Sequence, residues 1–386
     1  MDGVLRVAVD ATPLLGTRTG VGVFCECALA GLARRPELEL AAFAVSWRRR
    51  GGIRPHLPDG VRAVDRAMPA RPLHRAWSIG AFPAVEWFTG DQDVVHGTNF
   101  IVPPTRRAAR VMTIHDLTPV RYPEMCDDYT RTFPRLVRRA LAEGAWVHTP
   151  SRFVAAEVVE LLGAVPERVV AVHHGIPPVD GASPNASPDA TPDATPDQER
   201  PPGLPDGPYV LALGTVEPRK DLSTLVRAFD QVAAEEPDLR LVVAGPDGWG
   251  VDAFRDAVRA AAHGDRVVRT GWVGGSARAA LLRNARVYAY PSLYEGFGFP
   301  PLEAMLAGVP VVTTDAGALP EVVGDAAVLV TPGDADALAA AMRILVTDEQ
   351  ARTDAIGRGR QHVTAFSWDA AAEGLSGLYE KAAAAR

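Results

Sequence analysis

Two glutamates eight residues apart, Glu295 and Glu303, are the residues of this 386-residue chain whose types and spacing point most directly to chemistry. Carboxylates accept hydrogen bonds from sugar hydroxyls. Between them lie Gly296-Phe297-Gly298 and then Pro300 and Pro301, and prolines suit the first turn of a helix. Free backbone N–H groups and the positive end of a helix attract anions. A ligand that carries both hydroxyls and phosphate, such as a sugar nucleotide, fits this segment.

The flanking residues predict the elements that hold the two glutamates. Residues 287–290 and 309–312 are β-rich apolar runs bounded by Gly and Pro, as in parallel strands covered on both faces. Gly308 suits the C-terminal stop of a short helix. Glu295 is therefore expected in a loop at the carboxyl end of a strand, and Glu303 just inside the helix. In the alternative interpretation, Glu295 caps the loop and Glu303 is a solvated helix residue.

This segment resembles the E-x7-E signature of the retaining glycosyltransferases of family 4, and the resemblance extends over most of the chain. It implies the GT-B architecture, an α/β fold of two Rossmann-like parallel-sheet domains that face a central cleft. It also implies that Glu295 contacts the sugar, and Glu303 the ribose, of a nucleoside diphosphate sugar. The residues expected to reach sugar or phosphate oxygens beside them are Gly296, Phe297, Gly298 and Phe299.

A second segment supplies the positive charge that a diphosphate requires. The strand expected at residues 209–213 leads into a loop that starts with Gly214 and Thr215 and ends with Arg219 and Lys220. Such cations suit a leaving diphosphate. The loop resembles the diphosphate-binding loop of family 4. Many members carry Arg directly after the glycine, where this chain has Thr215, so Arg219 is expected to supply the second charge. A merely solvated pair of cations is the alternative.

The N-terminal half offers a histidine and a pair of glycines. The strand expected at residues 111–114 delivers His115 to the edge where ligands collect in open parallel sheets. Its HDLTP context resembles the histidine with which the family touches the donor sugar near its reactive carbon. A strand at residues 5–9 and a loop ending in Gly20 and Gly22 form a Rossmann-like opening without a strict G-x-G-x-x-G. We expect these glycines to approach the diphosphate or the acceptor, unless they form a simple tight turn.

The resemblance implies that a hexosyl unit is transferred to an acceptor hydroxyl with retention of the anomeric configuration. We assign the catalytic roles to His115, Glu295, Lys220 and Arg219, with the cations stabilising the charge of the departing diphosphate. Val273 is a candidate contact of the nucleoside base. The GTVEPRK form resembles that of mannosyltransferases that use GDP-mannose, so we expect this donor ahead of UDP- or dTDP-hexose. We expect a glycan, a glycolipid or a small natural product as the acceptor, and no tightly bound cofactor.

No metal site is expected. Asp91-Gln92-Asp93 matches the D-x-D pattern of metal-dependent glycosyltransferases, but it directly precedes a predicted strand and suits the turn into it. Three other classes of protein stay open. A nucleotide-sugar epimerase shares the architecture and would act without an acceptor. An NAD-dependent oxidoreductase would need a clean G-x-G-x-x-G, which neither half shows. A non-catalytic protein would bind the donor without transfer.

Charge is unevenly distributed along the chain. Its net charge is −7, yet residues 1–180 carry 22 arginines and 19 acids, a net +3, and the remainder carries 18 basic and 28 acidic residues, a net −10. The basic half, which includes a cluster at residues 47–54 beside Trp47, could face an anionic acceptor or membrane, or simply carry solvated arginines. Nucleic acid is not favoured as a partner, because the chain is acidic overall and has no interleaved aromatic–basic motif.

The remaining features concern location and domains. The start of the chain enters a strand without an apolar leader, no apolar run reaches membrane-spanning length, and three cysteines fit reduced thiols, so we expect a cytoplasmic protein. We predict an acceptor-binding domain at 1–178 and a nucleotide-sugar-binding domain at 208–365. Between them, a Pro/Asp/Ala-rich insertion at 179–207 departs from the family and cannot form a core. A C-terminal helix at 366–386 should pack back on the N-terminal domain.

Overall fold

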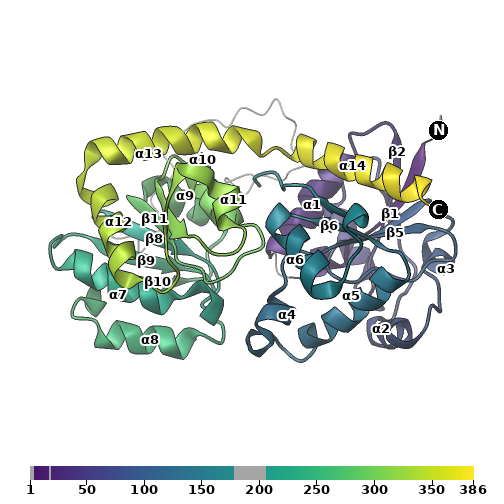
Figure 1. The fold of residues 1–386 in the computed structure, drawn as a ribbon, viewed down its shortest axis with the longest axis horizontal. Coiled ribbons are helices and arrows are strands. Elements are labelled where there is room, and N and C mark those ends of the chain that lie inside the picture. Colours follow the sequence, from purple (N-terminus) through teal and green to yellow (C-terminus); the bar gives the residue numbers. More distant parts are fainter. Residues whose placement is uncertain (1–3, 17–18, 178–205) are drawn as a thin grey trace. The chain divides into compact units, whose positions relative to one another are not determined.

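Two parallel sheets organise the chain, one in each of two units (Figure 1). The computed structural model of the protein describes residues 4–16, 19–177 and 206–386. The first unit comprises residues 1–175 and 366–386, and the second comprises residues 176–365. The insertion predicted at 179–207 lies almost wholly outside the described residues. None of the helices in the described part of the chain is long and apolar enough to cross a membrane.

The described strands of the first unit form a seven-stranded sheet in the order β3-β2-β1-β4-β5-β6-β7, with every neighbouring pair parallel. The order reverses between β1 and β4. The strands are β1 (Leu5–Asp10), β2 (Leu38–Phe43), β3 (Arg62–Val64), β4 (Val94–Gly97), β5 (Ala109–Thr113), β6 (Trp146–Thr149) and β7 (Val169–Ala171). The helices are α1 (Gly20–Leu32), α2 (Ala70–Ile79), α3 (Glu86–Thr89), α4 (Thr118–Arg121), α5 (Phe133–Ala142), α6 (Arg152–Leu162) and α14 (Trp368–Ala384).

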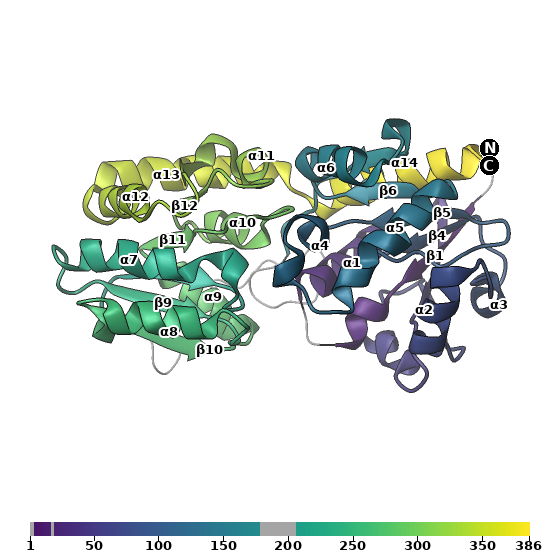
Figure 2. The same cartoon turned by 60° about the horizontal axis from the view of Figure 1, so that its bottom comes forward.

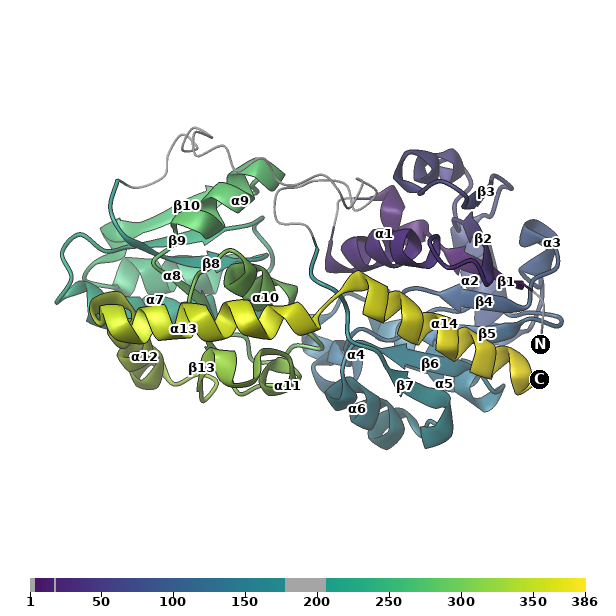
Figure 3. The ribbon, with the colours of Figure 1, turned by 90° about the horizontal axis from the view of Figure 1, so that it is seen from above.

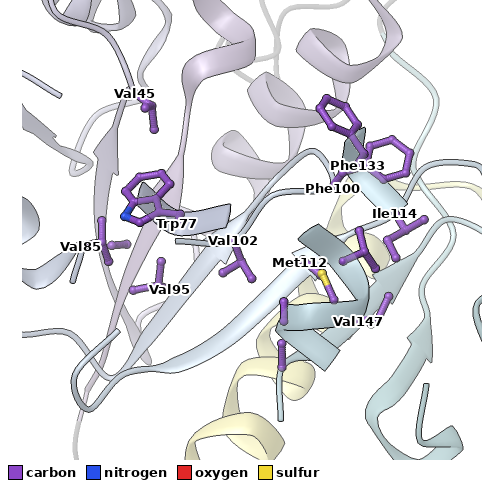
Figure 4. Close-up of a cluster of buried hydrophobic side chains, with 14 of the residues drawn as sticks. Val45, Trp77, Val85, Val95, Phe100, Val102, Met112, Ile114, Phe133 and Val147 are labelled. Atoms are coloured by element: carbon purple, nitrogen blue, oxygen red, sulfur yellow. The ribbon is translucent and has the colours of Figure 1, made fainter. Parts of the chain in front are cut away.

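The core of this unit follows from a parallel sheet that helices cover on both faces. On one face, Val95, Met112 and Val147 from successive strands pack with Trp77 of α2 and Phe133 of α5 (Figure 4). Each such side chain contributes about 1.5–3 kcal/mol when it is fully buried. Because both faces are covered, the strands are continuous apolar runs and not alternating ones.

The other face is covered by α1 together with α14, from the opposite end of the sequence (Figure 3). Phe24 and Leu29 of α1 share a buried cluster with Leu375 and Tyr379 of α14. The two helices approach closely at Gly31, where a Cβ atom would lie 2.9 Å from the Cβ of Ala372. The C-terminal helix is therefore part of the core of the first unit.

The described strands of the second unit form a six-stranded parallel sheet in the order β10-β9-β8-β11-β12-β13, which reverses between β8 and β11 (Figure 2). They are β8 (Tyr209–Leu213), β9 (Arg240–Ala244), β10 (Val267–Gly271), β11 (Val287–Tyr290), β12 (Val311–Thr314) and β13 (Ala327–Val330). The helices are α7 (Leu222–Ala233), α8 (Val251–Ala260), α9 (Gly275–Asn284), α10 (Phe299–Leu306), α11 (Leu319–Val323), α12 (Ala335–Thr347) and α13 (Glu349–His362). Two Rossmann-like α/β sheets are thus confirmed.

Two predicted boundaries are wrong. The first concerns Gly20 and Gly22, which lie in the first turn of α1 and not in a loop before it. The side chain of Thr19 accepts a hydrogen bond from the N–H of Gly22 at 3.5 Å, so the helix begins at a capping threonine. The second concerns residues 267–273, whose β-rich sequence predicts one strand, whereas β10 ends at Gly271 with a φ of +69° and leaves Val273 in the following loop. The capping threonine therefore decides where α1 begins, and the positive φ of Gly271 decides where β10 ends, against the residue propensities that we used.

A chain of buried polar groups runs between the sheet of the first unit and α14. His96 hydrogen-bonds the hydroxyl of Tyr379 and the Oγ1 of Thr113, both at 2.7 Å. Thr113 in turn contacts Nδ1 of His148 at 2.9 Å, and Nε2 of His148 contacts the carbonyl of Val172 at 3.1 Å. Burial lowers the pKa of His96 well below its usual value and that of His148 to about 3.

We expect the first unit to lose stability in mild acid because of these histidines. Their pKa values are lower in the folded chain than the ordinary 6.5, so the stability present above pH 6.5 is lost as the pH falls towards the folded values. With a folded pKa of about 3, His148 accounts for a loss of about 2 kcal/mol by pH 5, and His96 acts in the same direction. His148→Gln, which does not titrate, should flatten the fall of the melting temperature between pH 7.5 and 5. An unchanged slope in this variant would show that His148 does not cause the acid sensitivity.

Candidate active site

The point where the strand order of the second unit reverses lies between β8 and β11, and ligands of open α/β sheets bind at such points. The loop after β8 ends in a 3-10 turn, Pro218–Lys220. The loop after β11 contains Glu295 and leads into α10. Backbone hydrogen bonds join the two loops, since Leu293 N–H donates to the carbonyl of Arg219 at 2.8 Å. Both loops therefore present their side chains at the same sheet edge.

Glu295 is the centre of a buried ion cluster. Only 7% of its surface is exposed. Its Oε1 lies 2.5 Å from Nζ of Lys220, and its Oε2 lies 2.6 Å from Nη1 of Arg219. The hydroxyl of Tyr290 donates to Oε1 at 2.8 Å. Glu217 neutralises the second cation, because its Oε1 lies 2.8 Å from Nη2 of Arg219. The structure thus brings together three of the predicted catalytic residues.

The charges within this cluster determine the protonation of Glu295. Burial alone would raise the pKa of its carboxyl, but Arg219 and Lys220 outweigh burial and hold the pKa at about 2. Burial lowers the pKa of the Lys220 ammonium, while the attraction of Glu295 acts in the opposite direction. At neutral pH, Glu295 is therefore an ionised hydrogen-bond acceptor held beside two cationic groups.

Glu303, the predicted ribose contact, lies in α10 with its carboxylate buried. Its Oε2 forms an ion pair with Arg278 of α9. We did not predict Arg278 from the sequence. It is 25 positions from Glu303, and no local motif marks it. The signal that could have identified it is that α9, which carries Arg278 and Arg283, packs beside α10.

Glycines allow the segment from Glu295 to Phe299 to fold tightly. Gly298 precedes α10 with a φ of +106°, and Pro300 and Pro301 occupy the first turn of that helix, as predicted. Phe297 is buried, and its ring contacts that of Phe299 edge to face, with the ring centroids 5.4 Å apart. Gly296 is likewise buried.

The segment after β12 packs on the backbone of Glu295. The N–H of Ala318 donates to the carbonyl of Glu295 at 2.8 Å. Gly317 has a φ of +59°, and a Cβ atom there would lie 2.4 Å from the same carbonyl oxygen. Only glycine fits this position without moving the loop.

Gly214 and Thr215 lie at the end of β8, where backbones also come close. Gly214 N–H donates to the carbonyl of Ala244 at 2.9 Å, and a Cβ on Gly245 would lie 2.0 Å from the carbonyl oxygen of Gly214. Gly214 and Thr215 line a small hollow of about 10 Å³ together with Lys220 and Tyr290. The predicted diphosphate loop and the Glu295 cluster therefore share one location.

The first unit places His115 at the carboxyl edge of its own sheet, one strand away from the reversal between β1 and β4. His115 follows β5, and its Nε2 lies 2.9 Å from the carbonyl of Thr98, which follows β4. Since a carbonyl only accepts, Nε2 carries the proton and Nδ1 is left as the acceptor. Burial lowers the pKa of His115, so its ring is neutral at pH 7. The hydroxyl of Thr98 donates to the carbonyl of Asp10 at the end of β1, at 2.6 Å.

The other predicted residues lie elsewhere. Gly20 is on the exposed first turn of α1, and a Cβ on Gly22 would lie 3.2 Å from the carbonyl of Pro13. Val273 is half-buried in the loop between β10 and α9. Asp93 of the D-x-D pattern pairs with Arg6 at 3.2 Å. Within residues 4–16, 19–177 and 206–386, no group of three or more His, Cys, Asp or Glu side chains could hold a metal ion.

Replacing Gly317 by alanine should displace Glu295. Any L-residue at its φ costs about 1–2 kcal/mol, and the clash with the carbonyl of Glu295 adds to that cost. Gly333→Ala is the matched control, because Gly333 has a φ of +80° and nothing within 4 Å of the added Cβ. Urea unfolding should give a larger loss of stability for Gly317→Ala. Equal losses would mean that the close packing on Glu295 contributes nothing.

Comparison with known proteins identifies the family of this chain. The chain matches two family models, "Glycosyltransferase Family 4" over residues 18–179 and "Glycosyl transferases group 1" over residues 195–362. It is 32% identical over 301 residues to O-antigen chain mannosyltransferase B of Escherichia coli, which covers 77% of this chain and 74% of that protein.

Solved structures share the fold. Sucrose-phosphate synthase of Thermosynechococcus elongatus superposes with a TM-score of 0.71 at 21% identity, covering 99% of this chain and all of the other. Anabaena HepE in complex with UDP-glucose superposes with a TM-score of 0.69 at 17% identity, covering 98% of this chain and all of the other. Both lengths are covered almost completely, so the resemblance includes both sheets. The chain belongs to glycosyltransferase family 4, the group 1 glycosyltransferases, and has the GT-B fold.

Proposed function

We propose that this glycosyltransferase transfers a mannosyl unit from GDP-mannose, with retention, to an acceptor hydroxyl of a glycan, glycolipid or small natural product. The observation that carries the proposal is the buried cluster in which Arg219 and Lys220 hold the ionised Glu295. The mannosyl unit is supported by the similarity to an O-antigen mannosyltransferase. The UDP-glucose complex of HepE supports a nucleotide-sugar donor and makes UDP-hexose, with dTDP-hexose, the next candidate.

The cluster offers both functions that such a donor needs. Arg219 and Lys220 are cations at a sheet edge, so they can take up the charge that develops on a departing diphosphate. The carboxylate of Glu295 can accept hydrogen bonds from sugar hydroxyls, and that of Glu303 from ribose hydroxyls. The diphosphate charge is met by side chains, so we propose a reaction that requires no metal ion.

The first unit adds a neutral imidazole. His115 has its proton on Nε2 and a free acceptor on Nδ1. We propose that it hydrogen-bonds the donor sugar near the reactive carbon, where a neutral ring adds no charge to repel the developing cation. We propose attack from the same face as the departing diphosphate, which gives retention without a covalent intermediate. The diphosphate then serves as the acceptor of the proton from the attacking hydroxyl.

Lys220→Ala should lower kcat/KM for GDP-mannose by about 100-fold or more, because it removes a cation that stabilises the leaving group. The slow hydrolysis of the donor, detected as released GDP, measures this rate without knowledge of the acceptor. Lys381→Ala is the matched control, since Lys381 is the only other lysine and lies on the exposed face of α14. Equal rates of donor hydrolysis in the two variants would show that Lys220 has no part in the mechanism.

The same assay discriminates among donors and mechanisms. We expect turnover of GDP-mannose that EDTA does not change, and thermal stabilisation by GDP above that by UDP, dTDP or NAD. Loss of turnover in EDTA would disprove metal independence. Formation of a second sugar nucleotide without release of GDP would indicate an epimerase. Binding of the donor without any turnover would indicate a non-catalytic protein.

Arg278→Gln should raise the KM for the donor about tenfold and leave kcat within a factor of about two. Arg278 holds the buried carboxylate of Glu303, and a charged hydrogen bond contributes about 1.5–3 kcal/mol. Arg259→Gln is the control, because its ion pair with Asp256 is exposed on α8. A large fall in kcat with unchanged KM would contradict a role limited to binding the ribose.

We further propose that the first unit meets its acceptor at an anionic membrane surface. The net charge of +3 on residues 1–180, against −10 on the remainder, supports this assignment. The predicted cytoplasmic location stays a prediction.

A further inference from the structure

Three large apolar side chains of the first unit are exposed close together along the chain. They are Ile79, Phe82 and Trp87, with exposed fractions of 75%, 62% and 52%. The rings of Phe82 and Trp87 meet edge to face, with centroids 4.9 Å apart. The indole N–H of Trp77 donates to the carbonyl of Pro83 at 2.9 Å and holds this loop on α2. Single exposed apolar residues are ordinary, but a group held in place marks an interaction surface.

Helix α2 adds positive charge next to this group. Arg71, Arg75 and Ile79 are spaced by four residues, so they lie along one face of the helix, and all three are exposed. Leu73 and Trp77 are buried on the opposite side. The exposed face of α2 therefore carries two arginines and, at its C-terminal end, Ile79 of the apolar group.

Arginines lie on the other side of the group as well. A guanidinium N–H of Arg66 donates to the carbonyl of Trp87. The backbone N–H groups of Arg106 and Arg107 donate to Oε1 of Glu86, at 2.7 and 3.1 Å, so that the main chain holds this oxygen of the neighbouring carboxylate. All three arginines are exposed.

The arginines of this surface are not held in ion pairs with carboxylates of the described residues. Across the described residues, no carboxylate forms an ion pair with any of the five arginines, whereas nearby Arg54 pairs with Asp65 and Arg139 pairs with Glu143. We call this surface the α2–α3 patch, formed by the three apolar side chains and the five arginines. A surface that combines exposed aromatic rings with unpaired arginines complements a layer of lipid phosphates above apolar acyl chains.

We infer that the α2–α3 patch binds the surface of an anionic phospholipid bilayer. Phe82 and Trp87 enter the headgroup region, where an indole ring is favoured, and the arginines of α2 pair with lipid phosphates. This inference deepens the proposed membrane contact by naming the surface and the lipid charge, and it rests on that part of the proposed function. It does not depend on the identity of the donor or on catalysis.

Sedimentation of the full chain with vesicles tests this inference. We expect the chain to sediment with vesicles of phosphatidylethanolamine and phosphatidylglycerol, much less with phosphatidylcholine alone, and less as salt rises. Two double variants, Phe82→Ser with Trp87→Ser and Arg71→Glu with Arg75→Glu, should each lower the partition coefficient by more than about tenfold, given about fivefold per arginine. Ile344→Ser, which removes a 53% exposed apolar side chain from α12, should leave it unchanged.

Several results would overturn the inference. They are no sedimentation with anionic vesicles, equal binding to phosphatidylcholine, and equal binding by the wild-type chain and the Arg71→Glu, Arg75→Glu variant. A lipid-free dimer that the Phe82→Ser, Trp87→Ser variant dissociates would assign the patch to a second copy of the chain instead. The arginines lie on an exposed helix face, so their variant remains informative if the aromatic one fails to fold. The sedimentation assay contains no nucleotide, so a loss of vesicle binding is distinguishable from a failure of the proposed donor reaction.

Discussion

The buried carboxylate of Glu295 constrains the second unit more than any other single group. An ionised carboxylate that is almost fully buried is stable only if cations and hydrogen bonds compensate for its lost hydration. Lys220, Arg219 and Tyr290 supply them, and they come from β11 and from the loop after β8. These loops meet because β8 and β11 are adjacent at the reversal of the strand order. Sheet topology and site chemistry therefore depend on each other.

This arrangement also determines which chemical groups a ligand of the site needs. In the described structure, the positive charges of Arg219 and Lys220 are already met by Glu217 and Glu295. In the proposed mode of binding, a diphosphate shares these cations with the carboxylates, whose oxygens remain as acceptors for hydroxyl groups. The geometry therefore suits a ligand that carries phosphate and hydroxyl groups together, and it suits a simple anion less well.

The first unit uses buried polar groups in another way. His96 and His148 are neutral and connect the sheet to Tyr379 of α14, while His115 stands at the sheet edge with a free Nδ1. The C-terminal helix completes the core that α1 begins. Outside this core, the arginines of α2 and the rings beside them face solvent, so one unit carries both a sheet edge with a neutral imidazole and a charged surface.

Local patterns in the sequence determined the parallel strands, the short helix from Phe299 and the loops that carry Lys220 and Glu295, because apolar runs, prolines and glycines act over a few neighbouring residues. They also determined the family, through the spacing of the two glutamates. Only the tertiary structure decided that Arg278 pairs with Glu303, that Gly317 packs on Glu295, and that Ile79, Phe82 and Trp87 are exposed together. Each of these depends on how elements distant in sequence pack, and no local pattern encodes such contacts.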